Sequence, residues 1–345
     1  AARAAAASAL GLPVSHEIVL RGHDKTVLTV AIDPVGKRLA TGARDANVRL
    51  YDFGAMDSAH KSFRQFQPDE GYEVRALSYS PNGDRLLVAT AAMFPRIFSR
   101  DGEKVAAMVR GNVYLADAAN TTGHIAPLTA AQWHPRKSER VLTAARDATV
   151  RTWDLGGSKT NAWGEIESLD VIKVKNARGT KVVPTAVAYS ADAKLIAALA
   201  EDGSLQLWPA KSKRFAKPDT VVRDAHGAGD NSCLAFARDG ARLLTRGADD
   251  TMKLWDLRRL KSPLAVLPGL ENLVPTTTCA FSPDDKLLLT CTSVRPGAGT
   301  GSVEVFARDA VERGDTTDAA CSLKVAPGCS AVALTWHAAI NQIAV

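Results

Sequence analysis

Residues 123–155 read GHIAPLTAAQWHPRKSERVLTAARDATVRTWDL, and this stretch decides the fold. It opens on Gly-His and closes on Trp-Asp-Leu, and Asp147 stands six residues before Trp153. Three short apolar runs, separated by turn-forming or charged residues, lie between these marks at 127–133, 140–145 and 148–153. Runs of this length and spacing predict a three-stranded antiparallel meander, with a fourth strand to follow.

The same unit recurs along the chain. Residues 142–154 (LTAARDATVRTWD) align on residues 40–52 (ATGARDANVRLYD), and the aspartate stays six residues before the aromatic residue. That spacing also links Asp202 to Trp208, and it recurs in the unit that follows. The alignment divides the chain into seven units, at 26–66, 72–109, 125–174, 182–223, 231–267, 276–325 and 331–345.

A repeat of about 40–45 residues with four strands per unit is typical of WD-repeat propellers. We therefore predict an all-β fold, a seven-bladed WD-repeat β-propeller that forms a single domain over residues 15–345. The short alternating run His16–Leu20 is predicted to be the outer strand of the seventh blade. Such a strand would close the ring and remove the two open sheet edges of a linear array.

The two ends of the sequence differ from the repeat. Residues 1–14 are rich in alanine, and we interpret them as the linker or disordered end of a longer N-terminal extension. Residues 331–345 supply only the two inner strands of the seventh blade. We therefore expect the last blade to be incomplete here and the natural chain to continue.

Composition restricts the function only weakly. The chain has 43 basic and 37 acidic residues, a net charge of +6, which nucleic-acid contact would tolerate but does not require. The five cysteines form no C-x-x-C pair, which favours reduced thiols over a zinc site or a disulfide framework. No apolar run approaches the 18 residues of a membrane-spanning helix.

Histidine, threonine and aspartate recur together, and these are the residue types of a hydrolytic triad. One catalytic triad is enough for an enzyme, so three copies in one chain argue against catalysis. A hydrogen-bond network that stabilises each blade is needed in every blade and therefore explains the repetition. In that network the aspartate hydrogen-bonds the imidazole of the histidine, and the imidazole hydrogen-bonds the hydroxyl of the threonine. The hydroxyl oxygen in turn accepts a hydrogen bond from the aromatic residue of the blade. We predict such structural networks for His23, Thr41, Asp45 and Tyr51, for His124, Thr143, Asp147 and Trp153, and for His226, Thr245, Asp249 and Trp255.

Two basic runs, KVKNARGTK (173–181) and KSKRFAK (211–217), carry four cations each and no acid. On connecting loops of neighbouring blades they could face one polyanion, with an affinity that falls steeply with salt. The alternative is two solvated loops. The residues concerned are Lys173, Lys175, Arg178, Lys181, Lys211, Lys213, Arg214 and Lys217.

A more specific motif ends the fifth unit, where Trp255, Asp256 and Arg258 form the box W-D-x-R. It resembles the signature by which propeller substrate receptors dock on damage-specific DNA-binding protein 1, the adaptor of cullin-4 ubiquitin ligases. A planar guanidinium at a strand end can pair with a carboxylate of a partner. The alternative is chance, because the box occurs in many propellers.

Beyond the repeat, the chain resembles one family, the WD repeat-containing protein 70 or gastrulation-defective homologues. The resemblance is carried by SHEIVL (15–20), TGARDANVRLYDF (41–53), ANTTGH (119–124), VVPTAVAYS (182–190), MKLWDLR (252–258) and FSPDDKLLLT (281–290). The sequence departs from the family's pattern at 156–168 and 309–325.

The resemblance implies a nuclear, non-enzymatic protein. Family members are linked to cullin-4 ligase complexes in chromatin and DNA-damage responses, and to late spliceosomal assemblies. We therefore expect a scaffold that acts as a monomer within a large nuclear assembly, with RNA contact open and with no cofactor or metal. The alternative is the substrate-recognition subunit of a cullin-4 ligase. An enzyme is the least favoured class, because no carboxylate pair, nucleophile or metal set lies outside the repeat.

Overall fold

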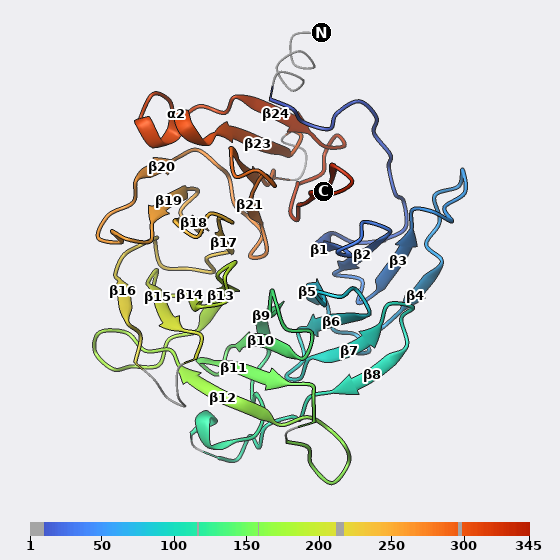
Figure 1. Cartoon of the computed structure of the whole chain (residues 1–345), viewed down its shortest axis with the longest axis vertical. Helices are drawn as coiled ribbons and strands as arrows, with labels where there is room; N and C mark the ends of the chain where they lie inside the picture. The colour runs from blue at the N-terminus through green and yellow to red at the C-terminus, as the bar shows by residue number, and fades with distance from the viewer. Residues whose placement is uncertain (1–9, 116, 158, 212–216, 296–298) are drawn as a thin grey trace.

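The computed structural model describes residues 10–345 except 116, 158, 212–216 and 296–298. Six four-stranded antiparallel sheets stand around a central axis like the blades of a wheel, each with its first strand innermost (Figure 1). The first three blades are built from β1 (Val27–Ile32), β2 (Arg38–Ala43), β3 (Val48–Asp52) and β4 (Arg64–Phe66); β5 (Val74–Tyr79), β6 (Arg85–Thr90), β7 (Arg96–Ser99) and β8 (Lys104–Ala107); and β9 (Leu128–Trp133), β10 (Arg140–Ala145), β11 (Thr149–Asp154) and β12 (Ser168–Lys173).

The next three blades follow the same order around the axis. They are built from β13 (Pro184–Tyr189), β14 (Leu195–Ala200), β15 (Leu205–Pro209) and β16 (Thr220–Val222); β17 (Cys233–Phe236), β18 (Arg242–Arg246), β19 (Met252–Asp256) and β20 (Ala265–Leu267); and β21 (Cys279–Phe281), β22 (Leu287–Cys291), β23 (Ser302–Ala307) and β24 (Cys321–Lys324). Each sheet falls within the residue range that the repeat predicts for its blade.

The core lies between neighbouring blades. Trp208 of blade four, for example, packs in one cluster with Leu142 and Ile172 of blade three. The second strand of each blade is covered on both faces, so that β10 and β14 are buried after their first residue. This explains their nearly continuous apolar sequences, in contrast to the exposed outer strand β4.

The prediction of seven blades is wrong. After blade six the described chain forms only a two-stranded sheet, from β25 (Thr335–His337) and β26 (Gln342–Ala344). The predicted strand at residues 16–20 is also absent, and its side chains Ile18 and Val19 are 61% and 54% exposed. An outer strand needs a third strand to pair with, and this sheet offers none in the described residues, so the backbone of 16–20 is left to water.

Side-chain contacts close the wheel instead. Leu12 is buried in a cluster with Leu287 of blade six and Leu334, just before β25. On the other side, His337 Nε2 lies 3.1 Å from the carbonyl oxygen of Pro34 in blade one. The two-stranded sheet therefore joins the last full blade to the first, without a strand from the N-terminal segment.

In the part of the chain that the structure describes, two short helices lie in connections between strands. The 3-10 turn η1 (Ala118–Asn120) precedes blade three, and α2 (Arg308–Arg313) follows β23 and ends at Gly314, whose φ is 76°. The repeat did not predict α2, because it falls in the segment where the chain leaves the family pattern. Within the residues that the structure describes, no helix combines the length and apolarity needed to cross a membrane.

Candidate functional site

Blade three holds a chain of hydrogen bonds that joins a turn to a tryptophan. His124 Nδ1 lies 3.0 Å from Asp147 Oδ2, and His124 Nε2 lies 2.8 Å from Thr143 Oγ1. The indole Nε1 of Trp153 donates to the same threonine oxygen at 2.7 Å. His124, Thr143 and Trp153 are fully buried, so their polar atoms depend on one another rather than on water.

The turn between β10 and β11 positions the aspartate. Asp147 Oδ1 accepts from the backbone N–H of Thr149 at 3.0 Å and from its hydroxyl at 2.6 Å. Ala148 between them has a φ of 59°, which completes a tight turn held by the carboxylate. From this turn β11 runs back to Trp153, which pairs with Val141, two residues from Thr143 on β10. The fixed spacing of six between Asp147 and Trp153 follows from this path.

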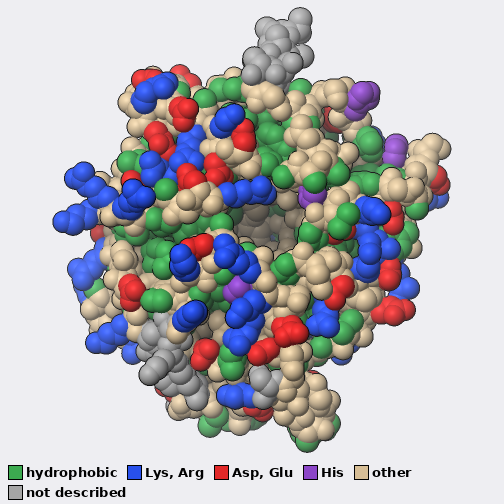
Figure 2. All heavy atoms as spheres, in the orientation of Figure 1, with side chains coloured by type: hydrophobic (Ala, Val, Ile, Leu, Met, Phe, Trp, Pro, Cys, Tyr) green, Lys and Arg blue, Asp and Glu red, His purple; other side chains and the backbone are tan. Residues whose placement is uncertain are grey.

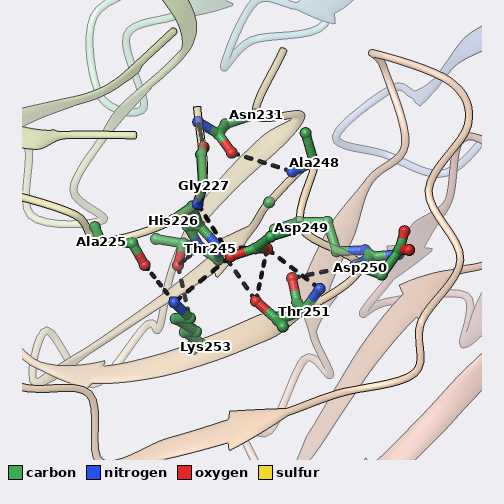
Figure 3. A network of polar contacts seen from close by, with 12 residues as sticks. Ala225, His226, Gly227, Asn231, Thr245, Ala248, Asp249, Asp250, Thr251 and Lys253 are labelled. Carbon is green, nitrogen blue, oxygen red and sulfur yellow. Dashed lines mark hydrogen bonds and ion pairs between the residues drawn. The ribbon is translucent and has the colours of Figure 1, made fainter. Parts of the chain in front are cut away.

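Blade five repeats the arrangement, and Figure 3 shows its His226, Thr245 and Asp249 from close by. His226 bridges Asp249 Oδ1 at 3.0 Å and Thr245 Oγ1 at 2.7 Å, and the Trp255 indole donates to Thr245 at 2.9 Å. Lys253 lies beside this chain and donates from Nζ to the carbonyl oxygen of Ala225 at 2.6 Å (Figure 3).

Blade one carries the third copy, with a phenol in place of the indole. His23 lies 2.9 Å from Asp45 Oδ2 and 2.8 Å from Thr41 Oγ1. Tyr51 takes the place of the indole in this blade, and burial raises the pKa of its phenol. The three networks thus share one geometry and differ in their last member. We use the name polar lock for each of them.

The electrostatics of the locks favour a neutral imidazole beside an ionised carboxylate. Burial lowers the pKa of His124, and it does the same to His226. Burial raises the pKa of Asp147, but hydrogen bonds from His124, Thr149 and the backbone N–H of Ile125 outweigh it and bring this pKa to about 2. Neutral His124 therefore donates from Nδ1 to Asp147 and accepts from the Thr143 hydroxyl at Nε2.

Burial also separates these locks from a hydrolytic triad. A triad must present its hydroxyl to a substrate. Thr143 and Thr245 have no exposed surface, and each hydroxyl already lies between an imidazole and an indole. In this packing neither hydroxyl can reach a substrate atom.

Blade two holds a different polar network that sequence reasoning missed. Thr90 Oγ1 donates to Asp69 Oδ2 at 2.7 Å, and Arg96 pairs with the other oxygen of this buried carboxylate. The available signal was position, since Asp69 precedes its blade's first strand by a few residues, as His23 and His124 do. The sequence interpretation searched for histidine at this position and therefore overlooked Asp69.

The W-D-x-R box lies at the end of β19. Trp255 is buried in its polar lock, and Asp256 pairs with Arg242 at 3.3 Å. Arg258 is exposed, and within the described residues its guanidinium has no carboxylate within ion-pair distance. Of the three predicted docking residues, Arg258 is the exposed one, whereas Asp256 is partly buried and Trp255 is buried.

The structure describes the first basic run in full and only the two ends of the second. The loop carrying residues 173–181 leads into Pro184, at the start of β13, whereas Lys211 lies two residues after Pro209, at the end of β15. Pro209 pairs with Leu195, next to the far end of β13. Lys211 therefore lies at the edge of blade four opposite the loop at 173–181, a strand length of roughly 20 Å away.

The individual cations of these runs also differ in surroundings. Lys173 Nζ lies 2.5 Å from Asp117 Oδ2, and Lys181 Nζ lies 3.9 Å from Asp117 Oδ1. The remaining cations whose placement is known are exposed: Lys175, Arg178, Lys211 and Lys217. Lys213 and Arg214 lie outside the described residues.

The wheel is hollowed at its centre, and Lys and Arg side chains gather round the hollow on the face shown in Figure 2. One pocket on the axis is lined by Arg44, Arg75 and Arg146 together with Glu73 and Asp230. Arg75 lies 3.1 Å from Glu73, and Arg146 lies 3.2 Å from Asp230. Sequence reasoning did not find this group, because its members come from several blades.

The sequence is similar to known proteins along nearly its whole length. A family model described as "WD domain, G-beta repeat" matches residues 15–52 and 222–256. WD repeat-containing protein 70 of Xenopus laevis is 42% identical over 335 residues, which are 97% of this chain and 51% of that protein. The human protein of the same name is 40% identical, over 97% of this chain and 49% of its own length. This chain is a WD-repeat propeller of the WD repeat-containing protein 70 family.

Family membership confirms the resemblance found in the sequence. The Drosophila melanogaster gastrulation defective protein 1 homolog is 36% identical over 96% of this chain and 48% of its own length. The chain spans about half the length of the curated relatives it matches. Among the described residues, no group of three or more His, Cys, Asp or Glu side chains could hold a metal ion.

Proposed function

We propose that this chain is a non-enzymatic scaffold of a large nuclear assembly, associated with the spliceosome or with chromatin. The observation that carries the proposal is the state of the polar locks. The residue types that could perform chemistry are buried in structural hydrogen bonds, while exposed side chains lie on loops around a repeated framework. Propellers of this kind present binding residues on loops held by a rigid scaffold. Membership in the WD repeat-containing protein 70 family supports the same function.

The scaffold function is tested by sedimentation of the tagged chain in nuclear extract. We expect the chain to sediment with large complexes, and treatment with ribonuclease or deoxyribonuclease separates a ribonucleoprotein from chromatin. Release by ribonuclease supports the spliceosomal form, and release by deoxyribonuclease supports the chromatin form. Sedimentation as a free chain before any treatment contradicts the proposal.

We propose, as a second candidate, that the chain is the substrate-recognition subunit of a cullin-4 ubiquitin ligase that acts in the DNA-damage response. Arg258 at the end of β19 favours it, because this arginine is exposed and pairs with no carboxylate of the described chain. An arginine in this position can form a two-pronged ion pair with a carboxylate of the adaptor.

Arg258→Ala tests the second candidate in a pull-down of damage-specific DNA-binding protein 1. Arg259→Ala is the matched control, because Arg259 is the exposed neighbour of Arg258 in the same connection. We expect Arg258→Ala to weaken capture of the adaptor and Arg259→Ala to leave it unchanged. Equal capture of the adaptor by the wild-type chain and by Arg258→Ala would contradict this candidate, because Arg258 is the residue that supports it.

A further inference from the structure

A tight turn before blade three exposes three apolar side chains in a row. Tyr114 is 93% exposed, and Val113 and Leu115 on either side of it are 42% exposed. The side-chain oxygen of Asn112 accepts from the Tyr114 backbone N–H at 3.0 Å, and its carbonyl accepts from Leu115 at 3.3 Å. This turn holds the aromatic ring out in water, where burial in a core does not explain it.

The base of the turn is firmly held. Gly111 donates its N–H to the carbonyl oxygen of His124 at 2.8 Å, and the two flanking glycines approach closely. A Cβ atom on Gly111 would lie 2.2 Å from the carbonyl oxygen of Gly123, and one on Gly123 would come even closer to the carbonyl oxygen of Val109. A larger residue therefore fits at neither glycine. The fully buried Arg151 donates to the carbonyl oxygen of Thr121 at 2.9 Å and to Ser168 Oγ at 2.8 Å. The turn therefore has a rigid support.

A basic loop lies against the same segment. Asp117, three residues after Tyr114, forms ion pairs with Lys173 and Lys181 of residues 173–181. Segments 110–117 and 173–181 together carry five cations (Arg110, Lys173, Lys175, Arg178 and Lys181) and one carboxylate. Arg110, Lys175 and Arg178 are exposed and form no ion pair with any described residue. The folded chain thus combines an exposed aromatic ring with an excess of positive charge.

We propose that the turn at 112–115 and the basic loop at 173–181 form a binding site for single-stranded nucleic acid. A base stacks on the Tyr114 ring, and Lys175, Arg178 and Arg110 contact the neighbouring phosphates. Aromatic rings stack on bases with little regard to sequence, and a strand must be unpaired to offer the face of a base. We name Tyr114, Arg110, Lys175 and Arg178 the strand platform.

The excess of cations favours nucleic acid over an acidic protein. Single-stranded nucleic acid supplies one phosphate for every nucleotide. A protein partner would need an apolar pocket for the Tyr114 ring and several carboxylates of its own around that pocket. The proposal goes beyond the scaffold function and does not depend on it, because the isolated chain can be tested with a defined strand.

The test measures fluorescence anisotropy of a labelled oligouridine of about 12 nucleotides against the purified chain, at several salt concentrations. We expect Tyr114→Ala to weaken binding about 5- to 100-fold, the range expected when one base no longer stacks, and Tyr114→Phe to retain binding. Trp163→Ala is the matched control, because Trp163 is 85% exposed on a different loop. It should leave binding unchanged, and thermal melting should show that every variant remains folded.

The phosphate contacts are tested by charge reversal. Lys175→Glu with Arg178→Glu should lower affinity and reduce the slope of log K against log salt by about 0.7 for each phosphate that the variant no longer neutralises. Lys211→Glu is the control, since Lys211 is exposed at the other edge of blade four. Its slope should equal that of the wild-type chain.

Several results would overturn the strand platform. These are no binding of the oligouridine at low salt, equal weakening by Trp163→Ala and Tyr114→Ala, and equal affinity for the strand and for a duplex of the same length. Binding of a poly-glutamate peptide as tightly as the strand would also overturn it and would indicate an acidic protein partner. An oligothymidine that binds like oligouridine supports the shared chemistry of single strands, with no readout of the ribose hydroxyl.

Discussion

Thr143 lies between a buried indole and a buried imidazole, and both depend on its hydroxyl. The same is true of Thr245 in blade five. A buried polar atom that loses its partner costs about 1–3 kcal/mol, so these threonines matter more for stability than their size indicates. At the scale of the residue, the polar locks therefore make two predictions.

Thr143→Val should lower the free energy of unfolding by about 2–5 kcal/mol. Valine has nearly the same shape, but it leaves His124 Nε2 and Trp153 Nε1 without partners. Urea denaturation followed by tryptophan fluorescence measures the change. Thr180→Val is the control, because Thr180 is exposed and should change stability by less than about 0.5 kcal/mol. Equal stability of the two variants would contradict the lock.

Stability should fall as the pH decreases from 7 to 5.5. Burial lowers the pKa of His124 and of His226 in the folded chain, so unfolding lets each bind a proton below its ordinary pKa of 6.5. Each histidine then lowers the free energy of unfolding by up to about 1.4 kcal/mol per pH unit. Asp147, with a folded pKa of about 2 against 3.8, adds a second decrease below about pH 4. Urea midpoints that stay constant or rise between pH 7 and 5.5 would contradict buried neutral histidines.

At the scale of the element, the segment before blade one shows how the wheel is closed. Residues 16–20 alternate like a strand, but the structure leaves them unpaired, while Leu12 is buried with Leu334. The alternation of polar and apolar residues in this segment led to the wrong prediction of a strand. A strand needs a partner strand with free backbone groups, and alternation alone does not supply one.

Leu12→Ala should therefore cost about 2–4 kcal/mol of unfolding free energy, in the range of buried leucine truncations. Val19→Ser should change stability by less than about 0.5 kcal/mol, because Val19 is 54% exposed. Denaturant titration of both variants measures the difference. A larger effect of Val19→Ser than of Leu12→Ala would show that residues 16–20 are paired as a strand after all.

At the scale of the whole molecule, the six blades and the two-stranded sheet differ in how well they are covered. β10 and β14 are buried on both faces, whereas β26 lies partly exposed at the edge of a two-stranded sheet. Hydrogen exchange should therefore be slowest in β10 and β14 and fast in β26 and residues 16–20. Mass spectrometry of peptic peptides measures these rates. Protection of 16–20 equal to that of β14 would indicate a seventh complete blade.

The sequence by itself determined the repeat, the limits of six blades and the residues of the three polar locks. These features lie within one repeat unit or just before it: the aspartate, the turn and the aromatic residue of a lock are a few residues apart, and the histidine stands 22 or 23 residues before the aspartate. The burial of each strand likewise follows its own pattern. Only the tertiary structure decided the number of blades, the closure by Leu12, the group of Arg44, Arg75 and Arg146, and the contact of Asp117 with the basic loop. The physical reason is that these contacts join residues far apart in the chain, and the order of residues along one blade carries no information about its neighbours across the axis.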